Sequence, residues 1–420
     1  MKTVLTLLLI FYFHSTSAST ITDLLKDVLL HAPSVIEARA ESASALSRME
    51  QARSAHWPIL TATGSKLLSQ KHRYPYDYNS EDIQPGVRGE LNLFASGAIE
   101  ADVSRSELEA EYYHYKIEET AEEAIRTFIS LYLDALREKK SIEVLERSLA
   151  RHNTILNDLN TISIHDQGRE SEFVQAGARR LMVRQQINTR NRTLKITLGK
   201  LSTLTTRPIT QENLENPFHS MTEIRLLTNF TQVPQKGNPS WLASQADLES
   251  KKAALKAQER AQYPRVDLTA SVTRDDKQIG VNLSWDLFNR NTSYGVREKV
   301  AQITASTGRL DSVSQLIGET GRLALITIRQ SKVEIATLQL QEQASAKVVD
   351  FYRLQFRVAR KTLIELLNAE NELYSVSLSR VQTEDQMLHG VLDYLYSQGM
   401  LLKWGGVSVA DANENKMAEN

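Results

Sequence analysis

The sequence predicts a mainly α-helical protein with a small β part, in which one structural unit occurs twice. Three features of the 420-residue chain predict this fold. Short segments alternate strictly between apolar and polar residues, very long stretches lack proline, and proline-containing motifs recur in the same order. The repeated unit is expected to run helix, strand, strand, long helix and returning helix.

The first feature is the alternation, which is clearest at about 264–274 and 278–288. Successive side chains of a strand point to opposite faces, so each segment should have one apolar and one polar face. Segments at about 58–68 and 86–94 show a similar pattern. The apolar positions that matter below are Val266, Leu268, Ala270, Val272, Leu283, Trp285, Leu91 and Leu93. Such strands suit either a soluble antiparallel sheet or the wall of a membrane barrel.

The second feature is the distribution of the nine prolines, none of which lies in 86–207 or 265–420. Proline breaks helices, so these stretches can form very long ones. Residues 98–167 also lack glycine and would form a helix of roughly 100 Å. Helical hairpins are expected at about 97–200 and 291–402. Apolar residues at 3/4 spacing predict coiled-coil seams along them. Examples are Ile142, Leu145, Leu149, His152, Leu156 and Leu159, then Ile335, Leu338, Glu342, Ser345, Val349, Tyr352 and Phe356.

The third feature is a long-period repeat. Pro33 and Pro239 lie in similar contexts, as do Trp57-Pro58 and Tyr263-Pro264, and both pairs are 206 positions apart (239 − 33 and 264 − 58). A duplication of this length makes each half one structural unit. The expected organisation is a signal peptide at 1–18, a first repeat at 19–200, a connector at 201–236, a second repeat at 237–405 and a polar tail at 406–420.

The N-terminus predicts export. Lys2, the apolar run 4–13 and the small residues 16–18 have the order of a secretory signal peptide. The apolar run is too short to span a bilayer, and no later stretch approaches 18 apolar residues. The mature chain is therefore expected to be periplasmic, secreted or an outer-membrane β protein.

Composition argues against several other classes. The net charge of −1 and the lack of a basic run argue against nucleic acid as a partner. There is no cysteine, which excludes disulfides, thiolate metal sites and a lipid-modified N-terminal cysteine. The nine histidines show no metal-binding spacing, and no serine lies in G-x-S-x-G. We expect no enzyme activity, no cofactor and no metal site.

The stretch 359–374 carries the most specific motif, Ala-Arg-Lys-Thr followed by Glu365, Leu-Leu-Asn-Ala and Leu-Tyr. The first half has a corresponding stretch, Gly168-Arg169-Glu170-Ser171, which leads to Ala178. With the order of elements, these motifs resemble the TolC-like outer-membrane efflux protein family over essentially the whole mature chain. The resemblance implies a homotrimer whose twelve strands form one β-barrel, continued by a helical tunnel across the periplasm.

The physical chemistry of membranes also indicates that several chains share one barrel. A four-stranded sheet in lipid leaves unpaired edges, and closure needs at least about eight strands. Several chains must therefore contribute, and the alternating apolar positions would face outer-membrane lipid. The aromatic residues Trp57, Tyr263, Phe94 and Phe288 lie at the helix-side ends of the strands. They would form an interfacial girdle, unless they are ordinary core residues.

The resemblance also assigns roles at the hairpin tips. Glu365 takes the first acidic aperture position, and Lys361 takes the basic position that holds the closed state. Asn368 replaces the second acidic site, Ala359 replaces a glycine and Val174 replaces an aspartate, so three rather than six carboxylates per trimer are expected. Glu172 is a possible partner for Lys361, and opening would untwist the hairpins that contain Gly168 and Ala359. Other helical carboxylates, Glu370 among them, are expected on solvated faces.

The function implied is an exit duct in the outer membrane of a Gram-negative bacterium, extending into the periplasm. It would serve efflux or type I secretion with a periplasmic adaptor and an inner-membrane transporter of the ABC or RND type. The alternative is a soluble periplasmic coiled-coil scaffold without a pore. A periplasmic adaptor would need a lipoyl-like β module beside one hairpin, and none is found in the sequence.

Overall fold

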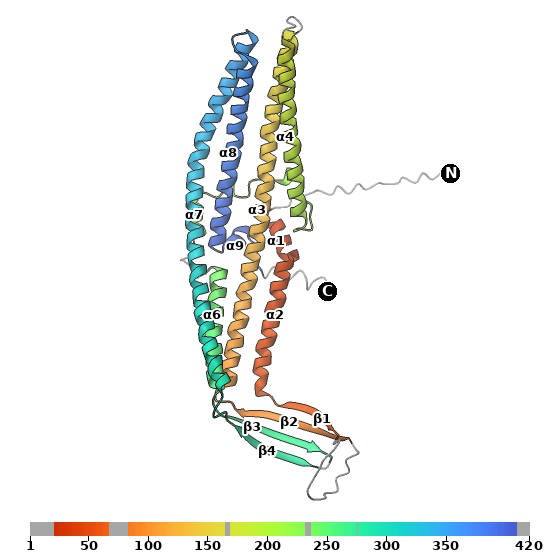
Figure 1. Cartoon of the computed structure of the whole chain (residues 1–420), viewed down its shortest axis with the longest axis vertical. Helices are drawn as coiled ribbons and strands as arrows, with labels where there is room; N and C mark the ends of the chain where they lie inside the picture. Colours follow the sequence, from red (N-terminus) through yellow and green to blue (C-terminus); the bar gives the residue numbers. More distant parts are fainter. Residues whose placement is uncertain (1–20, 67–82, 164–168, 232–236, 275, 410–420) are drawn as a thin grey trace, which may run out of the picture.

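The computed structural model describes residues 21–66, 83–163, 169–231, 237–274 and 276–409. The molecule is elongated, with helices along its long axis and one β-sheet at one end (Figure 1). The expected signal peptide, Gly168 and most of the polar tail lie outside the described residues.

Long helices dominate the described chain. The helices are α1 (Ile21–His31), α2 (Pro33–Arg53), α3 (Ala98–Ser163), α4 (Glu170–Ser202), α5 (Glu223–Asn229), α6 (Pro239–Arg260), α7 (Arg290–Arg357), α8 (Leu363–Ser397) and α9 (Leu401–Gly405). The strands are β1 (Ile59–Ser65), β2 (Gln84–Phe94), β3 (Arg265–Thr273) and β4 (Lys277–Ser284). The mainly helical class with a small sheet is confirmed.

The four strands form one antiparallel sheet in the order β1-β2-β3-β4, so β2 of the first half pairs with β3 of the second. Paired residues share a face, and their register therefore defines the two faces of the sheet. One face carries the rows Leu60-Gly89-Ala270-Ile279, Leu91-Leu268-Val281 and Phe94-Val266-Leu283. The other face carries Thr61-Arg88-Ser271-Gln278 and Asn92-Asp267-Asn282. The alternation seen in the sequence thus produces one apolar and one polar face.

Two details of the sheet differ from the expectation. β4 ends at Ser284, so Trp285 lies beyond the strand rather than in it. Its indole Nε1 donates a 3.1 Å hydrogen bond to the carbonyl oxygen of Gln262. The register also shifts between Asn92 and Phe94, so Phe94, rather than Leu93, pairs with Val266.

The sheet is uncovered. In Figure 1 no helix lies over either of its faces, and its outer strands β1 and β4 each have one unpaired edge within the described chain. Large apolar side chains on the apolar face are exposed, for example Leu60 at 75% and Ile279 at 77%. A contiguous exposed apolar surface of this kind marks a contact with a membrane or another chain.

The helices form a layer four helices wide. Near the sheet α2, α3, α6 and α7 lie side by side, and towards the far end the order is α4, α3, α8 and α7 (Figure 1). The edges of the layer are therefore α2 and α4 on one side and α7 on the other. Both α3, with 66 residues, and α7, with 68, run its length.

The heptad-like seams predicted from the sequence are confirmed. Leu145 and Leu159 on α3 are fully buried, as are Val349 and Phe356 on α7 to within a few per cent. The polar residue His152 is also buried in its seam, where Nδ1 lies 2.9 Å from the carbonyl oxygen of Ser148. Coiled-coil packing of paired helices follows from this spacing.

The largest apolar core lies in the middle of the molecule, where α1, α3, α8, α9 and the connector meet. Phe128 and Leu395 are fully buried there. Glu122 is buried beside them and accepts hydrogen bonds from the backbone N–H groups of Leu401 (3.0 Å) and Leu402 (2.9 Å). Burial raises the pKa of Glu122 to about 7, although the two N–H donors favour its ionised form.

Candidate functional site

The tip of the second hairpin is the turn between α7 and α8. After α7 the backbone N–H of Arg360 donates to the carbonyl of Gln355 (2.8 Å), and that of Ala359 to the carbonyl of Phe356 (3.0 Å). These two bonds form a Schellman motif, which places Ala359 in the left-handed region at φ 59°. A residue with a Cβ pays roughly 1–2 kcal/mol for this conformation, and glycine does not.

Replacing Ala359 with glycine is therefore expected to stabilise the protein by about 1 kcal/mol, because it removes the left-handed strain. Chemical unfolding of the full chain measures this change. The control is Ala336→Gly in the exposed interior of α7, which should destabilise by about 1 kcal/mol. Destabilisation of both variants alike would contradict the left-handed turn.

The charged side chains at the start of α8 interact with each other and with residues of the same hairpin. Thr362 and Glu365 form a capping box, in which the Thr362 N–H donates to Glu365 Oε2 (2.9 Å) and the Glu365 N–H to Thr362 Oγ1 (3.3 Å). Lys361 Nζ lies 2.6 Å from Glu365 Oε1 and 4.4 Å from the ring centroid of Tyr352. Lys361 thus has a partner four residues along its own chain.

The sequence left Glu172 open as a possible partner of Lys361. The ion-pair partner of Lys361 in the described chain is Glu365 and not Glu172, which pairs with Arg169 at 3.8 Å at the start of α4. The capping geometry brings the Glu365 carboxylate to its own N-terminus, within reach of Lys361, before any residue of α4.

The same contacts determine how the tip responds to pH. The Lys361 ammonium and then the N–H and hydroxyl of Thr362 lower the pKa of Glu365 to about 2. A carboxyl with a depressed pKa stabilises the fold above its ordinary pKa and loses that contribution as the pH falls towards the depressed value. The Lys361–Glu365 pair therefore persists as the pH falls until it approaches the depressed pKa of Glu365, and at the alkaline end it is lost once the pH passes the raised pKa of Lys361.

The structure brings Ala359, Lys361 and Glu365 together in one turn, while Asn368 lies one turn further on an exposed position of α8. Asn368 borders a cavity of about 110 Å³ between α3, α4 and α8. Val174 is exposed at the start of α4, and Gly168 lies outside the described residues.

Two links between the hairpins were not predicted from the sequence. Asp158 on α3 contacts Arg353 Nε (3.0 Å) and Arg357 Nη2 (2.6 Å) on α7. Burial of Asp158 opposes its ionisation, but the two guanidiniums outweigh this and lower its pKa. Glu370 is only 2% exposed and pairs with Arg151 of α3 at 2.6 Å, so its expected place on a solvated face is wrong.

A signal for the buried carboxylate was present in the sequence. Glu370 follows Leu366 and Leu367 by four and three residues and precedes Leu373 by three, which places it on the apolar face of α8. An apolar cluster with members from α3, α4, α7 and α8 lies between Glu370 and the tip of the second hairpin. Its residues are Ile155, Leu156, Leu159, Ala176, Phe356, Leu363, Leu366 and Leu367.

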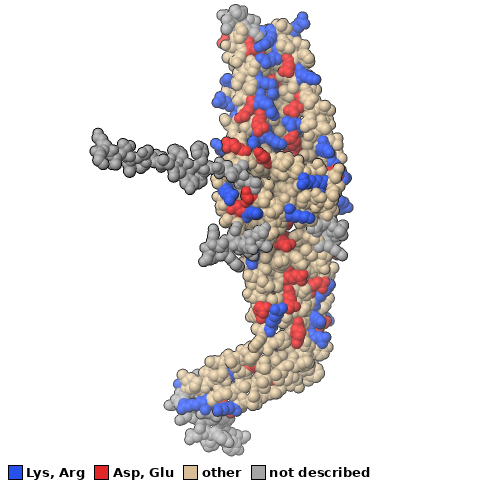
Figure 2. Space-filling model, turned by 180° about the vertical axis from the view of Figure 1, so that it is seen from behind, with Lys and Arg blue, Asp and Glu red and all other residues tan. Residues whose placement is uncertain are grey.

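At the opposite end, the register places the expected lipid-facing residues Val266, Leu268, Ala270, Val272, Leu283 and Leu91 on one face. Trp285 lies just past the end of β4, and Leu93 sits at the register shift of β2. On the side shown in Figure 2, charged side chains are spread over the helices, whereas the surface around the sheet–helix junction is largely uncharged.

Two other site types find no support in the described part of the chain. No group of histidine, aspartate and glutamate side chains there has the arrangement to hold a metal ion. None of the described helices combines the length and hydropathy needed to cross a bilayer.

The long helical layer ending in an uncovered, two-faced sheet is similar to the fold of solved outer-membrane channels. VceC of Vibrio cholerae matches with a TM-score of 0.77 over 90% of this chain and 96% of VceC, at 14% identity. The Campylobacter jejuni CmeC outer membrane channel gives 0.75 over 95% and 89%, at 15% identity. The Neisseria gonorrhoeae MtrE channel, in its open state, gives 0.73 over 91% and 89%, at 16% identity.

The sequence comparison narrows the class. Residues 232–392 match the family model described as outer membrane efflux protein. The outer membrane efflux protein BepC of Brucella suis is 20% identical over 357 residues, which cover 80% of this chain and 76% of BepC. The resemblance to the outer membrane efflux protein family is thereby confirmed, and this family and fold are those of channel proteins.

Proposed function

We propose that this protein is the subunit of a trimeric outer-membrane channel-tunnel that provides the exit duct for efflux or type I secretion. In this proposal residues 19–200 and 237–405 are two structural repeats, each contributing two strands and a helical hairpin. The observation that carries the proposal is that the sheet and the helical layer have their free edges on the same two sides of the molecule.

The first pair of edges belongs to the sheet. β1 follows α2 and β4 precedes α7, so each unpaired strand edge continues into an edge helix. Unpaired N–H and C=O groups cost several kcal/mol each in lipid, so both edges must find partners there. Pairing of β4 with β1 of the next copy satisfies both, and three copies would give a closed barrel of twelve strands, above the minimum of about eight.

The second pair of edges belongs to the helices. Besides its buried seam, α7 carries exposed apolar residues with spacings of three, seven and eleven: Leu323, Ile326, Val333, Leu340, Phe351 and Leu354. On the opposite edge of the layer, α4 exposes Val174, Leu181, Met182 and Ile196. Two exposed apolar stripes at coiled-coil spacing predict packing of α7 against α4 of another copy.

Both contacts are head-to-tail, since each joins one edge of a copy to the other edge of the next. Head-to-tail contacts produce a ring when the rotation between copies closes. A ring of these subunits would enclose the polar face of the sheet and surround it with outer-membrane lipid. The helices would form a tunnel through the periplasm below it.

The partners follow from the tunnel. An inner-membrane transporter of the ABC or RND type would supply the energy, and a periplasmic adaptor would join it to the hairpin tips. Opening would move the tips, and the Asp158 and Glu370 contacts tie the two hairpins of one chain together. We therefore propose that the two hairpins of a chain move together or break these links on opening.

Fractionation of cells that produce the full chain tests the proposal. A heat-modifiable trimer in the outer membrane is the expected result. A soluble periplasmic pool of the protein would contradict it and favour the coiled-coil scaffold.

The aperture gives a finer test. Because Lys361 neutralises Glu365 at 2.6 Å, replacing Lys361 with glutamine should unmask three carboxylates per trimer and raise cation preference. Glu365→Ala should have the opposite effect, because it leaves the Lys361 ammonium uncompensated. Reversal potentials in planar bilayers under a salt gradient measure both changes, and unchanged selectivity in both variants would remove this pair from the aperture.

A further inference from the structure

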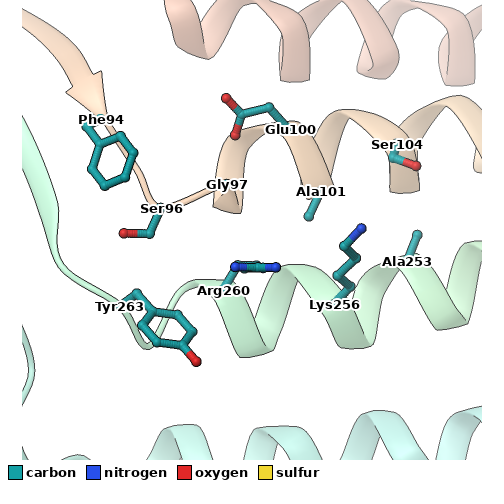
Figure 3. A pocket seen from close by; sticks show the side chains of 10 residues that line it. All are labelled: Phe94, Ser96, Gly97, Glu100, Ala101, Ser104, Ala253, Lys256, Arg260 and Tyr263. Carbon is teal, nitrogen blue, oxygen red and sulfur yellow. The ribbon is translucent and has the colours of Figure 1, made fainter.

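A cavity of about 560 Å³ lies where the sheet meets the helices, between the start of α3 and the end of α6 (Figure 3). Its lining combines aromatic side chains, Phe94 and Tyr263, with the cations Lys256 and Arg260. No role in the aperture or in pairing between copies requires these residues.

The register shows which side of the sheet the cavity adjoins. Phe94 shares its row with Val266 and Leu283, which belong to the apolar face. The cavity is therefore continuous with the surface that would meet lipid. Tyr263 and Phe94 are both more than half exposed at this level, as expected for side chains at a membrane interface.

The polar part of the cavity is positively charged. Lys256 and Arg260 lie four residues apart on one face of α6 and both line the cavity, and Lys256 extends towards α3 in Figure 3. Within the described part of the chain, neither side chain has an ion-pair or hydrogen-bond partner. Glu100, the carboxylate in the lining, points away from α6 in Figure 3.

The backbone adds to the positive potential of the cavity. Ser96 and Gly97, with φ of 53° and 80°, precede the 66-residue α3, and both line the cavity together with Glu100 and Ala101 of the first turn of that helix. A helix N-terminus carries roughly half a positive charge and offers free N–H donors to anions. The site thus pairs an anion-attracting end with an apolar wall.

We propose that this cavity binds the phosphate headgroup of an anionic phospholipid in the leaflet that faces the periplasm. The phosphate contacts Lys256, Arg260 and the start of α3, and the acyl chains lie along Phe94, Val266 and Leu283. The apolar wall favours a lipid over free phosphate, because two exposed cations alone hold a phosphate weakly in water. This inference rests on the proposed insertion of the sheet into a membrane.

The test uses the full chain in vesicles of phosphatidylethanolamine with a minor fraction of labelled phosphatidylglycerol. After mild extraction, native mass spectrometry counts the labelled lipid that each oligomer retains. The double variant Lys256→Gln/Arg260→Gln should retain roughly tenfold less than the wild type, since each basic residue near an anionic lipid contributes several-fold to binding.

The matched control is Lys251→Gln/Lys252→Gln, which removes the same charge from the same helix. Those lysines pair with Asp247 and Glu249 outside the cavity, so the control should retain wild-type lipid. Equal retention by both double variants would overturn the inference. So would complete release of the lipid by inorganic phosphate at a similar concentration, which would identify a site for free phosphate.

Conductance in planar bilayers separates this inference from the proposed function. A conducting wild type with equal lipid retention in both variants would refute the lipid site alone. A wild type that neither inserts nor conducts would refute both. Unchanged conductance of the double variant shows that it is folded when its lipid is lost.

Discussion

Replacing Leu268 with arginine is expected to prevent assembly of the protein in the membrane. Leu268 lies in the middle of β3, in the row Leu91-Leu268-Val281 of the apolar face. An arginine on the lipid face near the midplane of a barrel costs about 2–4 kcal/mol, and in a trimer this cost arises once in each of the three copies. The expected result is loss of the heat-resistant oligomer from outer-membrane fractions.

The control for Leu268→Arg is Ser271→Arg, which adds the same side chain to the same strand. Ser271 pairs with Arg88 and Gln278 on the polar face, where an added charge would face water in the lumen. This variant should assemble normally. A normal oligomer yield from Leu268→Arg would show that this face does not meet lipid.

The second large effect is expected on the helical edge. Leu340 is 68% exposed on the outer stripe of α7, which we propose packs against α4 of the next copy. Burying a leucine contributes roughly 1.5–3 kcal/mol, and Leu340→Asp removes this contribution at every interface. The substitution also adds the cost of removing the aspartate carboxylate from water. Native mass spectrometry of the detergent-extracted protein should show monomers in place of the oligomer.

Gln339→Asp is the matched control, because position 339 is exposed and lies off both seams of α7. It adds the same carboxylate one residue away and should leave the oligomer intact. If Leu340→Asp also leaves the oligomer intact, the outer stripe of α7 is not an interface.

The faces of the sheet could be predicted from the sequence because alternation is a local property of a strand. The end of β4 could not be predicted in this way. The apolar alternation continues to Leu287, but Ser284 already pairs with Arg265, the first residue of β3. Pro264 precedes Arg265 and has no N–H, so the backbone of Trp285 has no pairing partner on β3 and the strand ends.

The hairpin tip shows the same division. The order of Ala359, Lys361 and Glu365 in one turn followed from the motif, and the seams followed from 3/4 spacing. The partner of Lys361 did not, because it depends on which way the Glu365 side chain turns to complete the capping box. Glu370 and Asp158 are paired across helices far apart in sequence, and helix spacing alone does not specify such partners.

Disulfide cross-linking between β1 and β4 tests the central claim most directly, since the chain contains no cysteine of its own. The variants carry Val281→Cys together with a single cysteine placed in turn at Leu60, Ala62 or Gly64. Within one chain β1 and β4 are separated by two strands, about 14 Å, which exceeds the reach of a disulfide. Oxidised outer membranes should give a ladder of one, two and three linked chains that stops at three. Absence of cross-links at all three positions, or a ladder that continues past three, would contradict a barrel shared by three copies.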